Sequence, residues 1–194
     1  MSFAPERREL PVCRDERLLG HVVRLGGRPD TRQRGAKHGA AVSFDELTER
    51  LDIASLRQAD QAPAANFVNS VQTGKLLFLS GNTPGGQWPL KGKVGKDLTV
   101  EQGYQSARQA GLIMLSKMRT ALGSLDRVKR IVKVLGMVNS AEDFSDQPKV
   151  VNGFSDLMVE VFGEAIGKHA RSAVGMAGLP GNAPVEVEMI VEVE

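Results

Sequence analysis

The chain has 194 residues, a length that suits one domain of ordinary size, alone or with a tail. Hydrophobic residues make up 41% of the chain and charged residues 25%, which is typical of a globular protein with a buried core. No stretch approaches the roughly 18 consecutive apolar residues of a membrane span, which excludes an integral membrane protein. The net charge is +2 and the pI about 8.8, so the position of the basic residues decides whether nucleic acid is indicated as a partner.

The positive charge is concentrated near the N-terminus. Residues 1–41 contain nine basic and five acidic residues, a net charge of +4, whereas residues 42–194 carry a net charge of −2. The first segment is rich in Arg and Gly and shows no sustained apolar periodicity, so we predict a disordered basic arm over residues 1–41. This arm is interpreted either as an anchor for nucleic acid or anionic lipid, or as upstream sequence outside the fold. For the mildly acidic remainder we expect no nucleic-acid partner.

The cysteine content bears on the cellular compartment. Cys13 is the only cysteine, which excludes an internal disulfide and a cysteine-based metal cage. The basic arm also lacks the apolar run of roughly 7–15 residues that a secretory signal needs. We therefore expect a protein of the reducing cytoplasm, with no membrane partner.

Residues 42–65 are predicted to form a short helix and a linker. Phe44, Leu47 and Leu51 recur at helical spacing, which indicates an amphipathic helix over residues 44–59. An Ala- and Pro-containing stretch follows and connects this helix to the main domain, which we place at residues 66–194.

The main domain alternates between strand patterns and helix patterns. Thr99 and Gln102 have the spacing of a capping box, and Gly123 marks the end of the long helix that starts there. Residues 185–193 alternate strictly between apolar and mostly acidic side chains, which predicts a strand with one buried face. The expected elements are strands at 66–72 and 75–80, a helix at 99–123, a strand at 128–138, a helix at 148–163, and strands at 169–179 and 185–193. The order predicts an α+β fold, a sheet with two long helices on one face.

Several classes of site are disfavoured by the same sequence. The glycine-rich segments 81–86 and 92–97 lack the spacing of a nucleotide-binding phosphate loop. His169 is the only histidine of residues 42–194, so one subunit can build neither a His-pair ribonuclease mechanism nor a multi-histidine metal site. We expect no metal and no cofactor.

Arg171 is notable because small and apolar residues surround it in a predicted strand. A guanidinium in such a place is costly unless it is paired, and its planar fork suits a carboxylate. Two interpretations stay open: a structural salt bridge to a strand glutamate, or a site for the carboxylate of a ligand. Glutamates on the strand 185–193 are similarly typical of a solvated face when taken alone.

Short motifs over residues 66–194 together resemble one known family. They are Asn66-Phe67 before the hairpin, Leu79-Ser80-Gly81, Val151-Asn152-Gly153, Ala170-Arg171-Ser172, and Leu179-Pro180 followed by Val185-Glu186-Val187-Glu188. In this order and spacing they are similar to the RidA/YjgF family, the reactive intermediate (enamine/imine) deaminases, also called endoribonuclease L-PSP-like proteins. Strings such as Gly136-Met137-Val138-Asn139-Ser140 resemble a divergent bacterial branch of it.

The resemblance implies both an assembly and an activity. The family's fold is chorismate mutase-like, and its members are homotrimers whose sheets form a central barrel with ligand clefts between subunits. Its members hydrolyse 2-imino and enamine acids, such as tautomers of 2-aminoacrylate, to 2-keto acids and ammonia without a metal or cofactor. The expected ligand is therefore a small carboxylate or imino acid.

The resemblance also implies roles for individual residues. Arg171 matches the arginine that grips the substrate carboxylate, and Glu186 matches the acid that positions or activates the attacking water. Ser80 and Asn152 match polar residues that line the cleft. Phe67 stands where the family has a cleft tyrosine, so a hydroxyl is absent there. Two alternatives stay open: a non-catalytic trimeric carboxylate-binding or stress protein of the same fold, and a ribonuclease.

Overall fold

The computed structural model describes residues 43–50, 66–85 and 87–194. The predicted basic arm and the predicted linker lie outside these residues. The predicted helix at 44–59 is described only in its first part, which forms α2 (Phe44–Arg50). The ring of Phe44 packs edge-on against Phe162 with the centroids 5.0 Å apart, so α2 is attached to the main domain through an aromatic contact.

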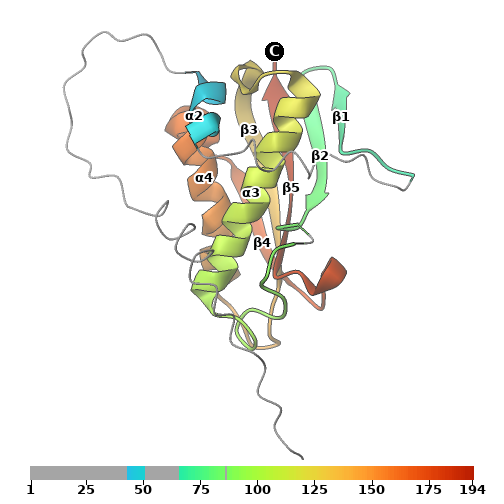
Figure 1. The fold of residues 1–194 in the computed structure, drawn as a ribbon, viewed down its shortest axis with the longest axis vertical. Coiled ribbons are helices and arrows are strands. Elements are labelled where there is room, and N and C mark those ends of the chain that lie inside the picture. Colours follow the sequence, from blue (N-terminus) through green and yellow to red (C-terminus); the bar gives the residue numbers. More distant parts are fainter. Residues whose placement is uncertain (1–42, 51–65, 86) are drawn as a thin grey trace, which may run out of the picture. The chain divides into compact units, whose positions relative to one another are not determined.

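The centre of the described fold is a five-stranded mixed sheet (Figure 1). Its strand order is β1-β2-β5-β3-β4. β3 and β4 pair in parallel, and the other neighbours pair antiparallel. The strands are β1 (Ser70–Thr73), β2 (Leu76–Asn82), β3 (Val128–Asn139), β4 (Ala170–Met176) and β5 (Val185–Val193).

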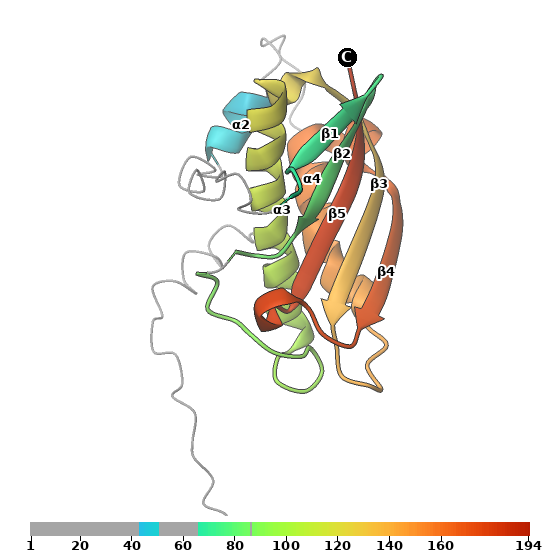
Figure 2. The same cartoon turned by 90° about the vertical axis from the view of Figure 1, so that its right-hand side faces the viewer.

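Two long helices, α3 (Val100–Leu122) and α4 (Gln147–Gly167), cover one face of this sheet (Figure 2). The capping box predicted for α3 is present, because the Thr99 hydroxyl accepts from the Gln102 amide and the Gln102 side chain accepts from the Thr99 amide. The predicted α+β class, with two long helices on one face, is confirmed. In the described part of the chain no helix has the length and apolar character needed to cross a membrane.

The core lies between the helices and the sheet. The valines and methionine that alternate along β5 are all buried, as the sequence pattern predicts. They share the core with Met114 and Leu115 of α3 and with Phe154 and Leu157 of α4. Gly153 lets α4 approach α3 closely, because a Cβ at this position would overlap the backbone carbonyl of Tyr104.

The boundaries of three predicted elements differ from the observed ones by three residues or more. The first strand was expected at 66–72, but the ladder of β1 starts at Ser70, which is paired with Leu79. Upstream of it, residues 68 and 69 are tied to Ser80 by single hydrogen bonds. The second long helix was expected to end at Gly163; its helical geometry breaks there, with φ at 73°, but a further turn continues to Gly167. β4 ends at Met176, before the predicted boundary.

Candidate functional site

The side chain of Arg171 lies on the helix-covered face of the sheet. Arg171 is paired with Val134 of β3, which is in turn paired with Met189 of β5, and both of these partners are buried under the helices. Paired residues point to the same face of a sheet. Because β4 is an edge strand, the arginine can reach sideways to the first turns of α4.

The Arg171 guanidinium contacts only neutral groups among the described residues. Its Nη1 donates to Asn152 Oδ1 at 2.9 Å and to Ser155 Oγ at 2.9 Å, and its Nη2 donates to the Pro148 carbonyl at 3.4 Å. Within the same residues it has no ion pair with a carboxylate, so the structural salt bridge to a strand glutamate is not found. A guanidinium has five N–H donors, and two of them, including Nε–H, are left for a ligand.

A serine and a histidine that the sequence analysis did not place in the site complete this cluster. Ser155 Oγ lies 3.1 Å from His169 Nε2, and His169 Nδ1 lies 2.7 Å from the Gly167 carbonyl oxygen. Burial lowers the pKa of His169, and the positive charge of Arg171 lowers it further, whereas the bond to Gly167 acts in the opposite direction. We call Asn152, Ser155, His169 and Arg171 the arginine cluster. The sequence signal was the position of His169, two residues before Arg171 in a chain segment with no other histidine.

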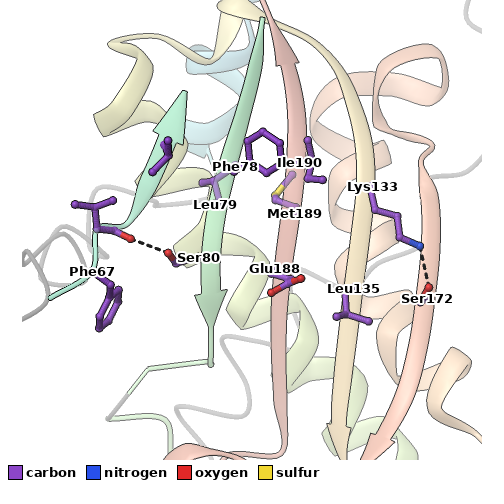
Figure 3. Close-up of a pocket in the computed structure, with 12 residues that line it drawn as sticks. Phe67, Phe78, Leu79, Ser80, Lys133, Leu135, Ser172, Glu188, Met189 and Ile190 are labelled. Atoms are coloured by element: carbon purple, nitrogen blue, oxygen red, sulfur yellow. Dashed lines mark hydrogen bonds between the residues drawn. The ribbon is translucent and has the colours of Figure 1, made fainter. Parts of the chain in front are cut away.

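Phe67 and Ser80 lie on the other face of the sheet, which we call the open face. Both line a hollow of about 740 Å³, together with apolar residues such as Phe78 and with Glu188 (Figure 3). The Ser80 hydroxyl donates to the Val68 carbonyl at 2.7 Å and so holds the segment that carries Phe67 against β2. On the far side of the hollow, Lys133 Nζ donates to Ser172 Oγ at 2.8 Å.

Glu186 also lies on the open face. Its neighbours Val185 and Val187 are buried under the helices, so the alternation of β5 turns Glu186 the other way. Gly81 of β2 makes room for it, because a Cβ at position 81 would overlap the Glu186 carboxylate. Partial burial raises the pKa of Glu186, and the nearby Glu188 raises it further.

The predicted site residues therefore form two groups within one chain. Arg171 of β4 is hydrogen-bonded to Asn152 of α4, whereas Phe67, Ser80 and Glu186 lie on the open face. Since the sheet separates the two faces, one chain does not bring its own Arg171 and Glu186 into a common site. Among the described residues, no three His, Cys, Asp or Glu side chains gather closely enough to hold a metal ion.

A second hollow, of about 960 Å³, lies where β3 and β4 end. Lys93 lines it, and its Nζ donates to Asn139 Oδ1 at 3.1 Å, to the Ser140 carbonyl at 3.2 Å and to the Ala177 carbonyl at 2.7 Å. These acceptors take all three ammonium hydrogens. Lys93 therefore ties its loop to the strand ends, and none of the predicted site residues lies in this hollow.

Known proteins resemble this chain in sequence and in fold. Protein TCP17 of Trypanosoma cruzi is 49% identical over 138 residues, which cover 69% of this chain and 85% of TCP17. The crystal structure of Atu1372 from Agrobacterium tumefaciens, a protein of unknown function, is 37% identical with a TM-score of 0.67 and is matched over 78% of this chain and 97% of its own. E. coli TdcF with bound serine shares the fold at 21% identity and a TM-score of 0.50, over 71% of this chain and 95% of its own.

A family profile covers most of the chain. The profile described as "YjgF/chorismate mutase-like, putative endoribonuclease" matches residues 48–193. This range includes every strand of the sheet, both long helices and all the residues of the arginine cluster. The chain therefore belongs to the YjgF/chorismate mutase-like family.

Proposed function

We propose that this protein hydrolyses small 2-imino acids and their enamine tautomers to 2-keto acids and ammonia. The observation that carries the proposal is the hydrogen bonding of Arg171: neutral groups hold its guanidinium, and two of its N–H donors are not taken by any of the described residues. A carboxylate takes two donors of a guanidinium in a bidentate pair. TdcF, which shares the fold, has been solved with serine, a small molecule that carries a carboxylate.

The proposed site combines two chains of a homotrimer, as the resemblance to the RidA/YjgF family implies. Arg171 would come from one chain and Glu186 from the next, because the two residues lie on opposite faces of their own sheet. The open face supports such an assembly, since Phe67 is 57% exposed, Val71 55% and Phe78 40%. Contiguous exposed apolar side chains of this kind are typical of a protein interface.

The reaction requires little more than water, a proton carrier and a held substrate. In the iminium form, the C2 carbon already attracts a nucleophile, so a water oxygen bonds to it while the Glu186 carboxylate takes one water proton. The resulting carbinolamine receives that proton on nitrogen, and its C–N bond breaks as the hydroxyl becomes the keto group and gives its proton to the Glu186 carboxylate. The departing ammonia then takes this proton. Water and the iminium acid thus yield a 2-keto acid and ammonium. Holding the carboxylate fixes C2 near the water, which lowers the entropic part of the barrier.

The raised pKa of Glu186 supports its role as the proton carrier. A carboxyl group that holds its proton more tightly than usual both accepts a proton from water more readily and remains a donor nearer to neutral pH. Ser80 and Phe67 would form the wall of the same cleft, with Phe67 as an apolar surface where the family has a tyrosine.

The proposal is tested by generating 2-aminoacrylate or 2-iminobutyrate with a dehydratase and following imine decay by semicarbazide trapping. We expect faster decay with the wild-type protein and none of this acceleration with Arg171→Ala. Acceleration that persists in Arg171→Ala, or none with the wild type, would contradict the deaminase. Saturable pyruvate binding without turnover would instead identify a carboxylate-binding protein. RNA cleavage that is lost with Arg171→Ala would favour a ribonuclease.

A further inference from the structure

We propose that Ser155 and His169 are positioning residues for Arg171, and that His169 acts on the guanidinium through the Ser155 hydroxyl. The inference rests on the proposed function, since it takes Arg171 as the group that binds the substrate carboxylate. It adds two residues whose role the motifs of the family resemblance do not supply. The carrying observation is a continuous series of short contacts from Gly167 through His169 and Ser155 to Arg171.

The direction of each hydrogen bond in this series follows from the chemistry of its ends. The Gly167 carbonyl can only accept, so His169 Nδ1 carries a hydrogen and donates to it at 2.7 Å. The neutral ring then has a bare Nε2, which accepts from the Ser155 hydroxyl at 3.1 Å. With its hydrogen used in this way, the Ser155 oxygen presents its lone pairs to Arg171 Nη1, which donates at 2.9 Å.

This series fixes the plane of the guanidinium. One Nη1 hydrogen is bound to Asn152 and the other to Ser155, so both Nη1 positions are defined. The donors that remain, Nε–H and one on Nη2, are thereby held in a fixed direction. Without His169 the Ser155 hydroxyl hydrogen loses its acceptor, so the oxygen that accepts from Nη1 is no longer held in one position.

The surroundings favour the neutral ring that this arrangement needs. Ser155 and the ring of Phe154, which lies edge-on with its centroid 6.4 Å from that of His169, are both neutral side chains of α4. Arg171 of β4 is the charged group whose field acts on the ring, and it opposes protonation. The neighbouring Lys168 is paired with Glu164 at 2.7 Å.

The test begins without ligand, on the full-length protein with ¹⁵N-labelled arginine. Rotation about the Cζ–Nε bond of Arg171 exchanges its two Nη groups, and NMR measures the rate. We expect exchange at least about fivefold faster in Ser155→Ala and in His169→Phe, which keeps a ring against Phe154 but removes both nitrogens. Ser155→Thr, which keeps the hydroxyl, should restore the slow rate. Ser145→Ala, in the loop before α4, is the matched control and should leave the rate unchanged.

The second arm measures kinetics with the imine substrate and affinity for pyruvate. For Ser155→Ala and His169→Phe we expect KM and the pyruvate Kd to rise about 5- to 10-fold, with kcat within about twofold. Ser155→Thr should again behave as the wild type. Thermal unfolding of each variant verifies that it is folded.

The two experiments distinguish failure of the positioning role from failure of the proposed function. Unchanged Nη exchange in folded Ser155→Ala would overturn the positioning role, and the deaminase could still stand. Faster exchange in a protein that neither binds pyruvate nor hydrolyses imines would support the positioning of Arg171 and contradict the proposed function. Faster exchange in Ser155→Ala alone would retain Ser155 and overturn the role of His169.

Discussion

The side chains of Arg171 and Glu186 lie on opposite faces of one sheet. Arg171 is in register with buried Val134, and Glu186 alternates with buried Val185 and Val187. The period of two along a strand fixes this relationship, because a residue can change its face only if the strand shifts its register. Two residues separated in this way can serve one substrate only when each is supplied by a different copy of the chain.

The first prediction concerns mixed assemblies of two inactive variants. Arg171→Ala and Glu186→Gln should each lose activity, with Glu186→Gln lowering kcat by about 10²- to 10⁴-fold. When the two are co-expressed in equal amounts and assemble at random as a trimer, about one site in four receives both intact residues. We therefore expect about a quarter of the wild-type imine hydrolysis per chain.

The control for this experiment is a mixture of the two variants that are purified separately, kept concentrated and assayed before their subunits exchange. That mixture should remain inactive. Co-expressed assemblies that stay as inactive as the single variants would contradict a site shared between chains.

The second prediction concerns the pH dependence that Glu186 gives to stability. Its pKa in the folded protein is raised above the ordinary value of 4.5, so the folded state holds this proton more tightly than the unfolded state does. Stability from this group is therefore greatest below the unfolded pKa and declines as the pH rises through the folded pKa. Glu186→Gln should raise the melting temperature at pH 7, and the gain should vanish at acidic pH where both states are protonated. An equal increase in melting temperature at both pH values would contradict the raised pKa of Glu186.

The third prediction concerns the room that Gly81 leaves for Glu186. Gly81→Ala places a methyl group against the carboxylate, which can turn aside, so we expect a loss of only about 1 kcal/mol in unfolding free energy together with a lower kcat. In a Glu186→Ala background the same change should cost almost nothing, because the group it collides with is absent. Denaturant unfolding of the four proteins forms a double-mutant cycle. An equal loss of unfolding free energy in both backgrounds would show that the added methyl group does not act through Glu186.

The fourth prediction concerns the contact between α3 and α4. A Cβ at Gly153 meets the Tyr104 carbonyl, which is backbone and cannot move aside as a side chain can. Gly153→Ala should therefore lower the unfolding free energy by about 3 kcal/mol. Gly178→Ala is the matched control: nothing lies within 4 Å of its Cβ, and we expect a change within about 0.5 kcal/mol. Similar stabilities of the two variants in urea would contradict close packing at Gly153.

The fifth prediction links His169 to the ligand. Burial lowers the pKa of His169, and the positive charge of Arg171 lowers it further. A carboxylate bound to Arg171 should offset the effect of that charge and raise the pKa of His169. The ring resonances can be titrated by NMR with and without saturating pyruvate. His21 and His38, which precede the main domain, provide references in the same spectrum. A His169 titration that pyruvate leaves unchanged would contradict carboxylate binding at Arg171.

The sequence predicted those features of the fold that depend on local patterns. The capping-box spacing at Thr99 predicts a helix start, and the alternation along 185–193 predicts a strand with one buried face. Both features are observed. The predicted start of the first strand at residue 66 was wrong. The apolar character of Phe67 and Val68 favoured a strand, but both residues are exposed and neither is paired in the ladder of β1. Apolar character alone does not distinguish a residue of a strand from one that lies beside it.

The candidate site could be predicted only in part. The family resemblance indicated Arg171 and Asn152, which are 19 positions apart in the chain, and the structure joins them by a hydrogen bond. Ser155 was missed because its contact with Arg171 depends on how α4 packs beside β4, and no local pattern specifies that. Whether Arg171 forms a salt bridge to a strand glutamate depends on which face of the sheet each side chain occupies. Glu186 and Glu188 lie on the face opposite to that of Arg171.

The open face has a consequence for how the protein behaves at low concentration. Phe67, Val71 and Phe78 stay in contact with water when the chain is alone. In the proposed trimer a second molecule would cover them and supply the hydrophobic free energy of that burial. If the trimer forms as proposed, dilution should weaken the folded state as well as the site that two chains share, and the protein concentration becomes one of the variables that set stability.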